Sequence, residues 1–169
     1  MDYIDFNNDH APLGYLITFR SYGTWLHGDK QGSVDRFHRG HDTPKLSPNS
    51  ARKRYEEALL KQRAVILDSR QRAAIKSGVR ETCTVRKWSL WALNVRTNHV
   101  HAVVSANRKP ETILNALKAN ATRSMRDAGC WCSDQSPWTY RGSKKYLWTE
   151  KELADAIAYV EYDQGEPLP

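Results

Sequence analysis

The sequence contains few cysteines and no long apolar run. Its three cysteines, Cys83, Cys130 and Cys132, are odd in number and lack CxxC spacing, which argues against a disulfide framework and a structural zinc site. No apolar stretch approaches the roughly 20 residues that a membrane-spanning helix needs. The acidic start, Met1 to Asp5, is unlike the basic start of a signal peptide. These absences predict a cytoplasmic protein with reduced thiols and no membrane partner.

Positive charge is in excess. The 169 residues carry 26 Lys and Arg against 19 Asp and Glu, which gives a net charge of +7. Such a balance favours an anionic partner such as nucleic acid, although a solvated basic surface would have the same composition. The length and the 40% apolar content predict a single domain over residues 1–169, with a polar arm at 1–12 and a long irregular loop at 23–47.

The pattern of apolar residues predicts an α+β fold. Period-2 and β-branched runs indicate strands, and apolar residues at helical spacing, with capping residues before them, indicate helices. The expected strands are 14–22, 88–95, 101–106 and 144–148, and the expected helices are 47–62, 68–86, 110–129 and 149–163. Their βαββαβ order predicts a ferredoxin-like antiparallel sheet with helices on one face, followed by a closing C-terminal helix.

A His-Val-His triplet lies at the start of the second arm of the predicted hairpin. Side chains alternate along a strand, so His99 and His101 should project from the same face while Val100 faces the other. Two adjacent imidazoles are half of a metal site. A chance pairing of two of the six histidines is the competing explanation.

The last predicted helix carries Tyr159 and Asp163 four residues apart, and therefore on one helical face. A carboxylate one turn after a tyrosine could complete a metal site and hold the tyrosine over the same metal. The alternative is a buried aromatic on an amphipathic helix next to a solvated acid.

Together these patterns resemble a known family. A strand-borne His-hydrophobic-His about sixty residues before a helical Tyr-Val-Glu resembles the HUH single-strand transposases with one catalytic tyrosine, and among them the REP-associated tyrosine transposases. The resemblance also rests on motifs spread over most of the chain, namely Phe19 to Asp29 with Ser33 to Arg36, Ile113 to Ala119, Gly142 to Trp148, and Ala158 to Gly165.

The resemblance implies a DNA nickase and strand transferase that forms a 5′-phosphotyrosine intermediate. His99 and His101 would bind Mg²⁺ or Mn²⁺, and Tyr159 would be the nucleophile, with Tyr162 as the rival. Zinc would suit two imidazoles alone, but oxygen ligands and phosphate match Mg²⁺ or Mn²⁺ better. Family members generally have Asn or Gln where Asp163 aligns, so the third ligand is either Asp163 or Gln164.

The same resemblance implies a substrate of single-stranded DNA with a hairpin, and hence a nucleoid-associated location. Relatives are either homodimers that exchange the tyrosine helix or monomers. Single strands are bound by phosphate contacts and base stacking, and the candidate residues for these contacts are Arg20, Trp25, Arg36, Lys118, Arg123, Lys144 and Lys145, with Trp148 as a second stacking candidate. Two alternatives remain, a domesticated role in processing repeated hairpins and a basic nucleic-acid-binding module without catalysis.

Overall fold

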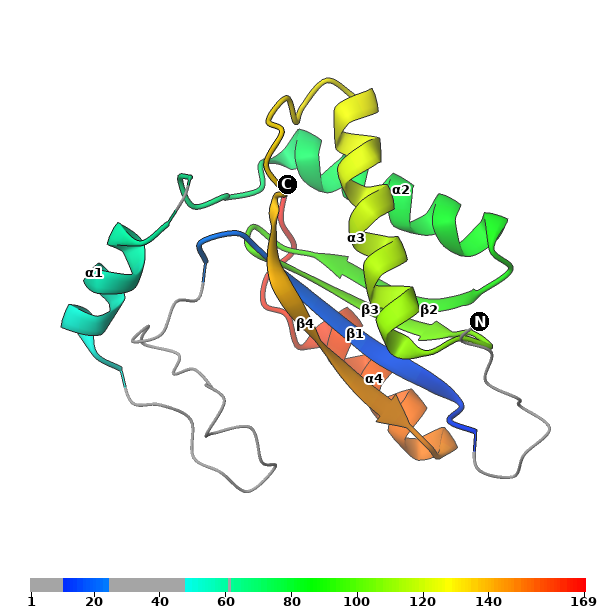
Figure 1. The fold of residues 1–169 in the computed structure, drawn as a ribbon. Helices are drawn as coiled ribbons and strands as arrows, with labels where there is room; N and C mark the ends of the chain where they lie inside the picture. Colours follow the sequence, from blue (N-terminus) through cyan, green and yellow to red (C-terminus); the bar gives the residue numbers. More distant parts are fainter. Residues whose placement is uncertain (1–10, 25–47, 61) are drawn as a thin grey trace.

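A four-stranded antiparallel sheet forms the centre of the protein in a computed structural model, which describes residues 11–24, 48–60 and 62–169 (Figure 1). The strands are β1 (Gly14–Ser21), β2 (Ser89–Val95), β3 (His99–Ser105) and β4 (Trp138–Leu147). Their spatial order is β2-β3-β1-β4. This order, reached through βαββαβ connectivity, is the ferredoxin-like arrangement, so the predicted fold class is confirmed.

Two helices, α2 (Ser69–Val85) and α3 (Pro110–Asp127), cover one face of the sheet. Both begin where the sequence predicts, because Asp68 forms a capping box with Gln71 and Pro110 occupies the first turn of α3. Gly78, which weakens α2 as an isolated helix, is needed where the two helices meet. A Cβ atom at this position would lie 2.7 Å from the Cβ of Ser124.

The main hydrophobic core lies between these two helices and the sheet. Tyr15, Ile17 and Phe19 of β1 are fully buried in it. The Phe19 ring packs edge-to-face against Trp138 of β4, with the ring centroids 4.8 Å apart. Aromatic pairs of this kind add to the free energy gained by burying their surface.

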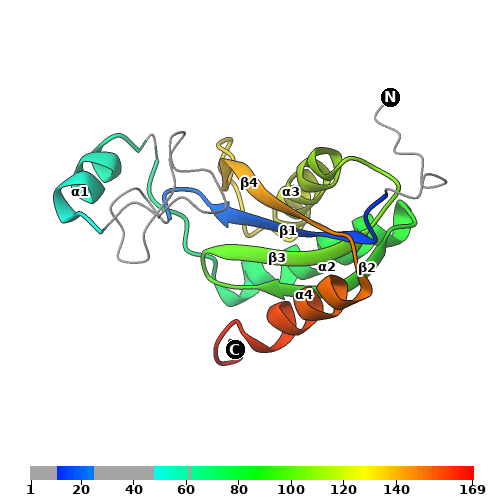
Figure 2. The same cartoon turned by 90° about the horizontal axis from the view of Figure 1, so that it is seen from below.

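The C-terminal helix α4 (Glu150–Tyr162) packs on the opposite face of the sheet, as Figure 2 shows by the positions of α3 and α4. The predicted capping box between Thr149 and Glu152 is present. The apolar contact is small. Its buried residues are Ala92, Val103, Leu147, Ala156 and Val160, and the partly buried Leu16, Leu153 and Ile157 pack against them. Because α4 covers only part of this face, polar side chains occupy the rest of it.

The remaining elements differ from the sequence prediction in length. Helix α1 (Ser50–Ala58) is shorter than the expected 47–62, has no buried residue, and stands apart from the sheet (Figure 1). Strand β4 starts six residues before the expected 144. Its first half was missed because an edge strand with one exposed side lacks a long apolar run.

Most of the predicted arm at 1–12 and of the predicted loop at 23–47 lies outside the described residues. Of the helices in the described ranges, none has both the length and the apolar character required to cross a bilayer.

Candidate active site

The two histidines of the triplet lie side by side on the face of the sheet that carries α4. In the β1–β3 pairing, Arg20 is opposite His99 and Thr18 is opposite His101. Opposite residues of paired strands point to the same face, so all four side chains share one surface. The two imidazole centroids are 4.6 Å apart, and His101 is only 6% exposed.

A hydrogen bond orients each imidazole. The Nδ1 atom of His99 lies 2.6 Å from Oδ1 of Asn98, and Nδ1 of His101 lies 2.6 Å from the hydroxyl of Thr18. The amide oxygen of Asn98 can only accept, so His99 carries its proton on Nδ1. The lone pair of His99 Nε2 is therefore available to a ligand.

Both imidazoles are neutral at neutral pH. Burial, the neighbouring His99 and the positive charge of Arg20 together lower the pKa of His101 to about 4, against a smaller opposing effect of Gln164. Burial is also the main cause that lowers the pKa of His99. Neutral imidazole is the form that binds metal ions, so the pair is ready for a cation without first losing protons.

Tyr159 extends from α4 toward the histidines. Its ring centroid lies 5.5 Å from that of His101, and 41% of its surface is exposed. The rival Tyr162 is 76% exposed, and no ring contact joins it to a histidine in the described ranges. The amide of Asn94 in β2 donates to the carbonyl of Val160 at 3.0 Å, which fixes α4 next to Tyr159.

Of the two candidate third ligands, Gln164 is the one that contacts the histidine pair. Its Nε2 donates to the carbonyl of Tyr159 at 3.0 Å, which turns Oε1 toward His99 Nε2, 3.4 Å away. Asp163 is exposed. Among the described residues, no group of three or more His, Cys, Asp or Glu is arranged to hold a metal, so Asp163 does not form such a cluster with His99 and His101.

The donor set fits a divalent cation. His99 donates its Nδ1 proton to Asn98, so its Nε2 atom carries a lone pair and no proton. This Nε2 atom faces Oε1 of Gln164, which also carries lone pairs. A cation bound there would satisfy both atoms. Two imidazoles and an amide oxygen would leave positions for water and phosphate oxygens, as Mg²⁺ and Mn²⁺ sites require.

A cavity of about 490 Å³ opens beside these groups. It is lined by Leu16, Thr18, Arg20, His101, Ser143, Lys145, Glu152, Asp155, Ala156 and Tyr159. Burial lowers the pKa of Arg20 to about 10, and the interaction with Tyr159 partly offsets this shift. Arg20 therefore keeps its charge at neutral pH, and it lines the same cavity as Lys145, where both can bind phosphate.

The other predicted DNA contacts have different surroundings. The ammonium of Lys118 donates to the carbonyls of Thr139 at 2.7 Å and Arg141 at 3.0 Å. Lys144 forms an ion pair with Glu111 at 2.9 Å, and Arg123 forms one with Glu81 at 3.5 Å. None of these three lysine and arginine side chains lines the cavity beside Tyr159. Trp25 and Arg36 lie outside the described residues.

Sequence reasoning missed the residues that orient the site. Asn98 stands at the predicted turn next to the triplet, but nothing in the sequence indicates its contact with Nδ1 of His99. Thr18 and Asn94 gave no signal, because their role depends on which residues the sheet places next to His101 and α4.

The family model for IS200-like transposases matches residues 58–161. A structure of a REP-associated tyrosine transposase bound to a REP hairpin is 11% identical, with a TM-score of 0.49, and the match covers 95% of this chain and 67% of that one. A proposed transposase from Deinococcus radiodurans is 17% identical, with a TM-score of 0.45 and coverage of 92% and 93%.

No curated protein matches the sequence. The family model spans more than half of the chain and includes the histidine pair and Tyr159, so this protein belongs to the IS200-like transposase family.

Proposed function

We propose that this transposase-family protein is a metal-dependent endonuclease and strand transferase that acts on single-stranded DNA through Tyr159. The observation that carries the proposal is the position of the Tyr159 ring, 5.5 Å from His101 in a cavity that also contains Arg20 and Lys145. One cavity contains a nucleophile, the neutral His101 imidazole and two cationic side chains, and the His99 imidazole lies next to His101. These groups match the needs of a phosphodiester reaction.

The chemistry is a transesterification. The Tyr159 oxygen forms a bond to the scissile phosphorus while the bond from phosphorus to the 3′ oxygen breaks. The phenol loses one proton and the departing 3′ oxygen gains one, so the products are a 5′-phosphotyrosine and a free 3′-hydroxyl. Arg20 and Lys145 would hold the phosphate and offset its negative charge. The covalent link conserves the bond energy, so attack by another 3′-hydroxyl rejoins the strand without a nucleotide cofactor.

His99, His101 and Gln164 are the residues that we propose to hold Mg²⁺ or Mn²⁺. When bound, the cation would polarise the phosphate and favour the ionised tyrosine. The neutral donor set supports this proposal, as does the orientation of Gln164 by the Tyr159 carbonyl.

Hairpin-bearing DNA is the proposed substrate. A structural neighbour is a REP-associated tyrosine transposase bound to a REP hairpin. The tyrosine and the histidines that we assign to one site lie together in a single chain, so we propose that one protomer can complete the reaction without exchanging α4 with a partner.

Adduct formation tests the proposed nucleophile. The protein is incubated with a labelled, hairpin-bearing single strand and Mn²⁺, and a protein–DNA adduct that survives denaturation is measured on a gel. We expect Tyr159→Phe to abolish the adduct and the matched variant Tyr162→Phe to retain it. The reverse result would assign the reaction to Tyr162. A wild-type protein that binds the strand without nicking it would support the non-catalytic binding module instead.

Mn²⁺ titration calorimetry tests the third ligand. We expect Gln164→Ala to weaken Mn²⁺ binding and Asp163→Ala, next to it in the sequence, to leave binding unchanged. A loss confined to Asp163→Ala would favour the carboxylate as the ligand.

A further inference from the structure

The segment after α4, residues 163–169, contacts the turn between β2 and β3. The guanidinium of Arg96, which lies in this turn, donates to the main-chain carbonyl of Glu166 at 2.7 Å. One residue before this contact, Gly165 has a φ of +80°, a left-handed conformation that other residues rarely adopt. The glycine therefore permits a sharp change of chain direction at the point where Arg96 holds the segment.

Arg96 joins the segment after α4 to the strand of the histidine pair. Its main-chain N–H donates to the carbonyl of His99 at 2.8 Å, while its side chain binds Glu166. Gln164 lies between Glu166 and the end of α4, and its own Nε2 donates to the Tyr159 carbonyl at 3.0 Å. The chain is therefore held on both sides of the position from which the Gln164 oxygen faces His99.

A second arginine holds the segment further along the chain. Arg72 of α2 is only 7% exposed, and its guanidinium donates to the carbonyls of Leu67, at 3.0 Å, and Pro169. The N–H of Leu67 donates in turn to the carbonyl of Thr97 at 2.7 Å, in the same turn between β2 and β3. Because this second attachment is independent, loss of the Arg96 side chain should loosen the segment locally without unfolding the protein.

The charge of Arg96 opposes a cation at the histidines. Burial lowers the pKa of His99, and the positive charges of Arg20 and Arg96 add to this shift. The same charge would repel a bound divalent cation. If Arg96 affected the cation through charge alone, its removal would tighten cation binding. If Arg96 acts by fixing the position of a ligand, its removal would weaken binding, so the two explanations predict opposite signs.

We propose that Arg96 is a positioning residue that keeps the Gln164 side chain within reach of His99 by fixing the segment after α4. It acts through Gln164 and does not bind the cation itself. The inference rests on the proposed function only in taking His99, His101 and Gln164 as the cation site, and it does not require Tyr159 as the nucleophile.

A double-mutant cycle measured by Mn²⁺ titration calorimetry without DNA tests this proposal. We expect Arg96→Ala to weaken Mn²⁺ binding roughly tenfold, as loss of a group that orients a ligand typically does. In a Gln164→Ala background the same change should cause no further loss, because Arg96 acts through Gln164. Unchanged or tighter binding by Arg96→Ala overturns the proposal, and so does a tenfold loss that persists in the Gln164→Ala background.

Arg96→Lys separates position from charge, since it keeps the charge and a long donor. It should bind Mn²⁺ more tightly than Arg96→Ala, whereas charge alone would make it bind more weakly. Equal or weaker binding by Arg96→Lys than by Arg96→Ala overturns the proposal.

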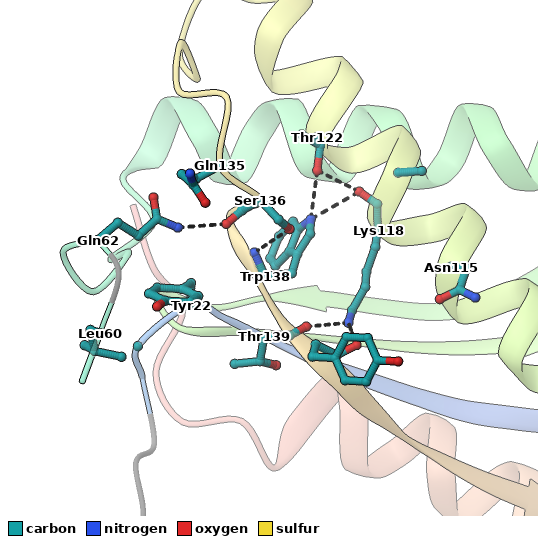
Figure 3. A pocket seen from close by; sticks show the side chains of 13 residues that line it. Tyr22, Leu60, Gln62, Asn115, Lys118, Thr122, Gln135, Ser136, Trp138 and Thr139 are labelled. Carbon is teal, nitrogen blue, oxygen red and sulfur yellow. Dashed lines mark hydrogen bonds between the residues drawn. The ribbon is translucent and has the colours of Figure 1, made fainter. Parts of the chain in front are cut away.

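Lys118→Ala is the matched control. The Lys118 ammonium also donates to a main-chain carbonyl at 2.7 Å, that of Thr139, but on the other face of the sheet (Figure 3). Its removal deletes one positive charge and one such contact, and it should leave Mn²⁺ affinity unchanged. Thermal melting should show all variants folded. An equal loss of Mn²⁺ affinity in Lys118→Ala overturns the specific role of Arg96.

Hydrogen exchange without metal gives a readout that is independent of the cation. Arg96→Ala should speed amide exchange in residues 163–166, and Lys118→Ala should not. Unchanged exchange of these residues in Arg96→Ala overturns the proposal.

Failure of this inference is distinguishable from failure of the proposed function. Wild-type protein that binds no Mn²⁺ overturns the proposed cation site together with the role of Arg96, whereas normal binding by both wild type and Arg96→Ala overturns the role of Arg96 alone. If Mn²⁺ binds but no covalent adduct forms, the proposed reaction is overturned, and the double-mutant cycle still decides the role of Arg96.

Discussion

The two faces of the sheet differ in what they bury. On the face covered by α2 and α3, β1 contributes Tyr15, Ile17 and Phe19, all fully buried. On the face covered by α4, the same strand contributes Thr18 and Arg20, which lie at the histidine pair. One strand thus supplies the centre of the core and part of the candidate site, through the alternation of its side chains.

The candidate site can be polar because the face of the sheet opposite to it carries the main hydrophobic core. Burying Arg20 and two histidines costs free energy, and the apolar contact on that face is limited to a few residues of α4 and the strands. The stability must come mainly from the other face. We therefore expect substitutions on the face covered by α2 and α3 to lower mainly the free energy of unfolding. Substitutions on the face covered by α4 should weaken mainly DNA or metal binding.

Phe19→Ala should lower the free energy of unfolding by about 3–5 kcal/mol, because it leaves a cavity beside Trp138 in the main core. Urea denaturation measures the effect. Arg20→Ala, one residue later on the opposite face, is the matched control and should cost much less stability while weakening DNA binding. Equal destabilisation by the two variants would contradict the division of roles between the faces.

Lowering the pH should destabilise the protein through the α4 face. His101 has a pKa of about 4 when folded and near 6.5 when unfolded, so between these values the unfolded chain binds more protons. The free energy of unfolding should fall by up to about 3 kcal/mol as the pH drops through this window.

Urea denaturation at several pH values measures this slope. His101→Asn serves as the control and should flatten it. A slope unchanged in His101→Asn would assign the acid sensitivity to other groups.

The hydrogen-bond partners of the histidines should affect metal binding more than stability. Thr18→Val and Asn98→Ala remove the groups that orient His101 and His99, and loss of such partners typically weakens metal binding by roughly 10- to 100-fold. Mn²⁺ titration calorimetry measures the change. Thr82→Val, on the α2 side, is the matched control, and unchanged Mn²⁺ affinity in both site variants would contradict the proposed metal site.

Asn94→Ala should have the smallest effect, about 1 kcal/mol in the free energy of unfolding. It removes the hydrogen bond from β2 to the Val160 carbonyl, and it should slow adduct formation by releasing the end of α4 near Tyr159. Stability and adduct rate are measured on the same preparation. A slower rate without loss of stability would mean that Asn94 acts on the reaction by another route.

The sequence predicted the elements with strong local signals. The capping residues Asp68 and Thr149, and Pro110 at the first position of α3, mark three helix starts correctly, because these signals depend on neighbours in the chain. The start of β4 was missed because residues 138–143 are mostly polar. Gly142 in this stretch is required by packing, since a Cβ there would lie 2.6 Å from the Thr18 carbonyl oxygen.

The site was predictable where its residues share one element. His99 and His101 are two apart on a strand, so their common face follows from the alternation of side chains. The choice between Asp163 and Gln164 depends on how α4 ends, and there a shift of one residue changes which side chain faces the sheet. Contacts across the sheet, such as Thr18 with His101, depend on strand register, which the sequence did not specify.

Gln164 contacts both parts of the candidate site: its Nε2 donates to the Tyr159 carbonyl, and its Oε1 lies 3.4 Å from Nε2 of His99. If α4 moved along its axis by one residue, about 1.5 Å, Tyr159 would move away from His101. The same movement would separate the Gln164 oxygen from His99. The position of the lightly packed α4 along its axis would therefore determine, at the same time, where the Tyr159 nucleophile and the proposed cation ligand Gln164 lie relative to the histidines.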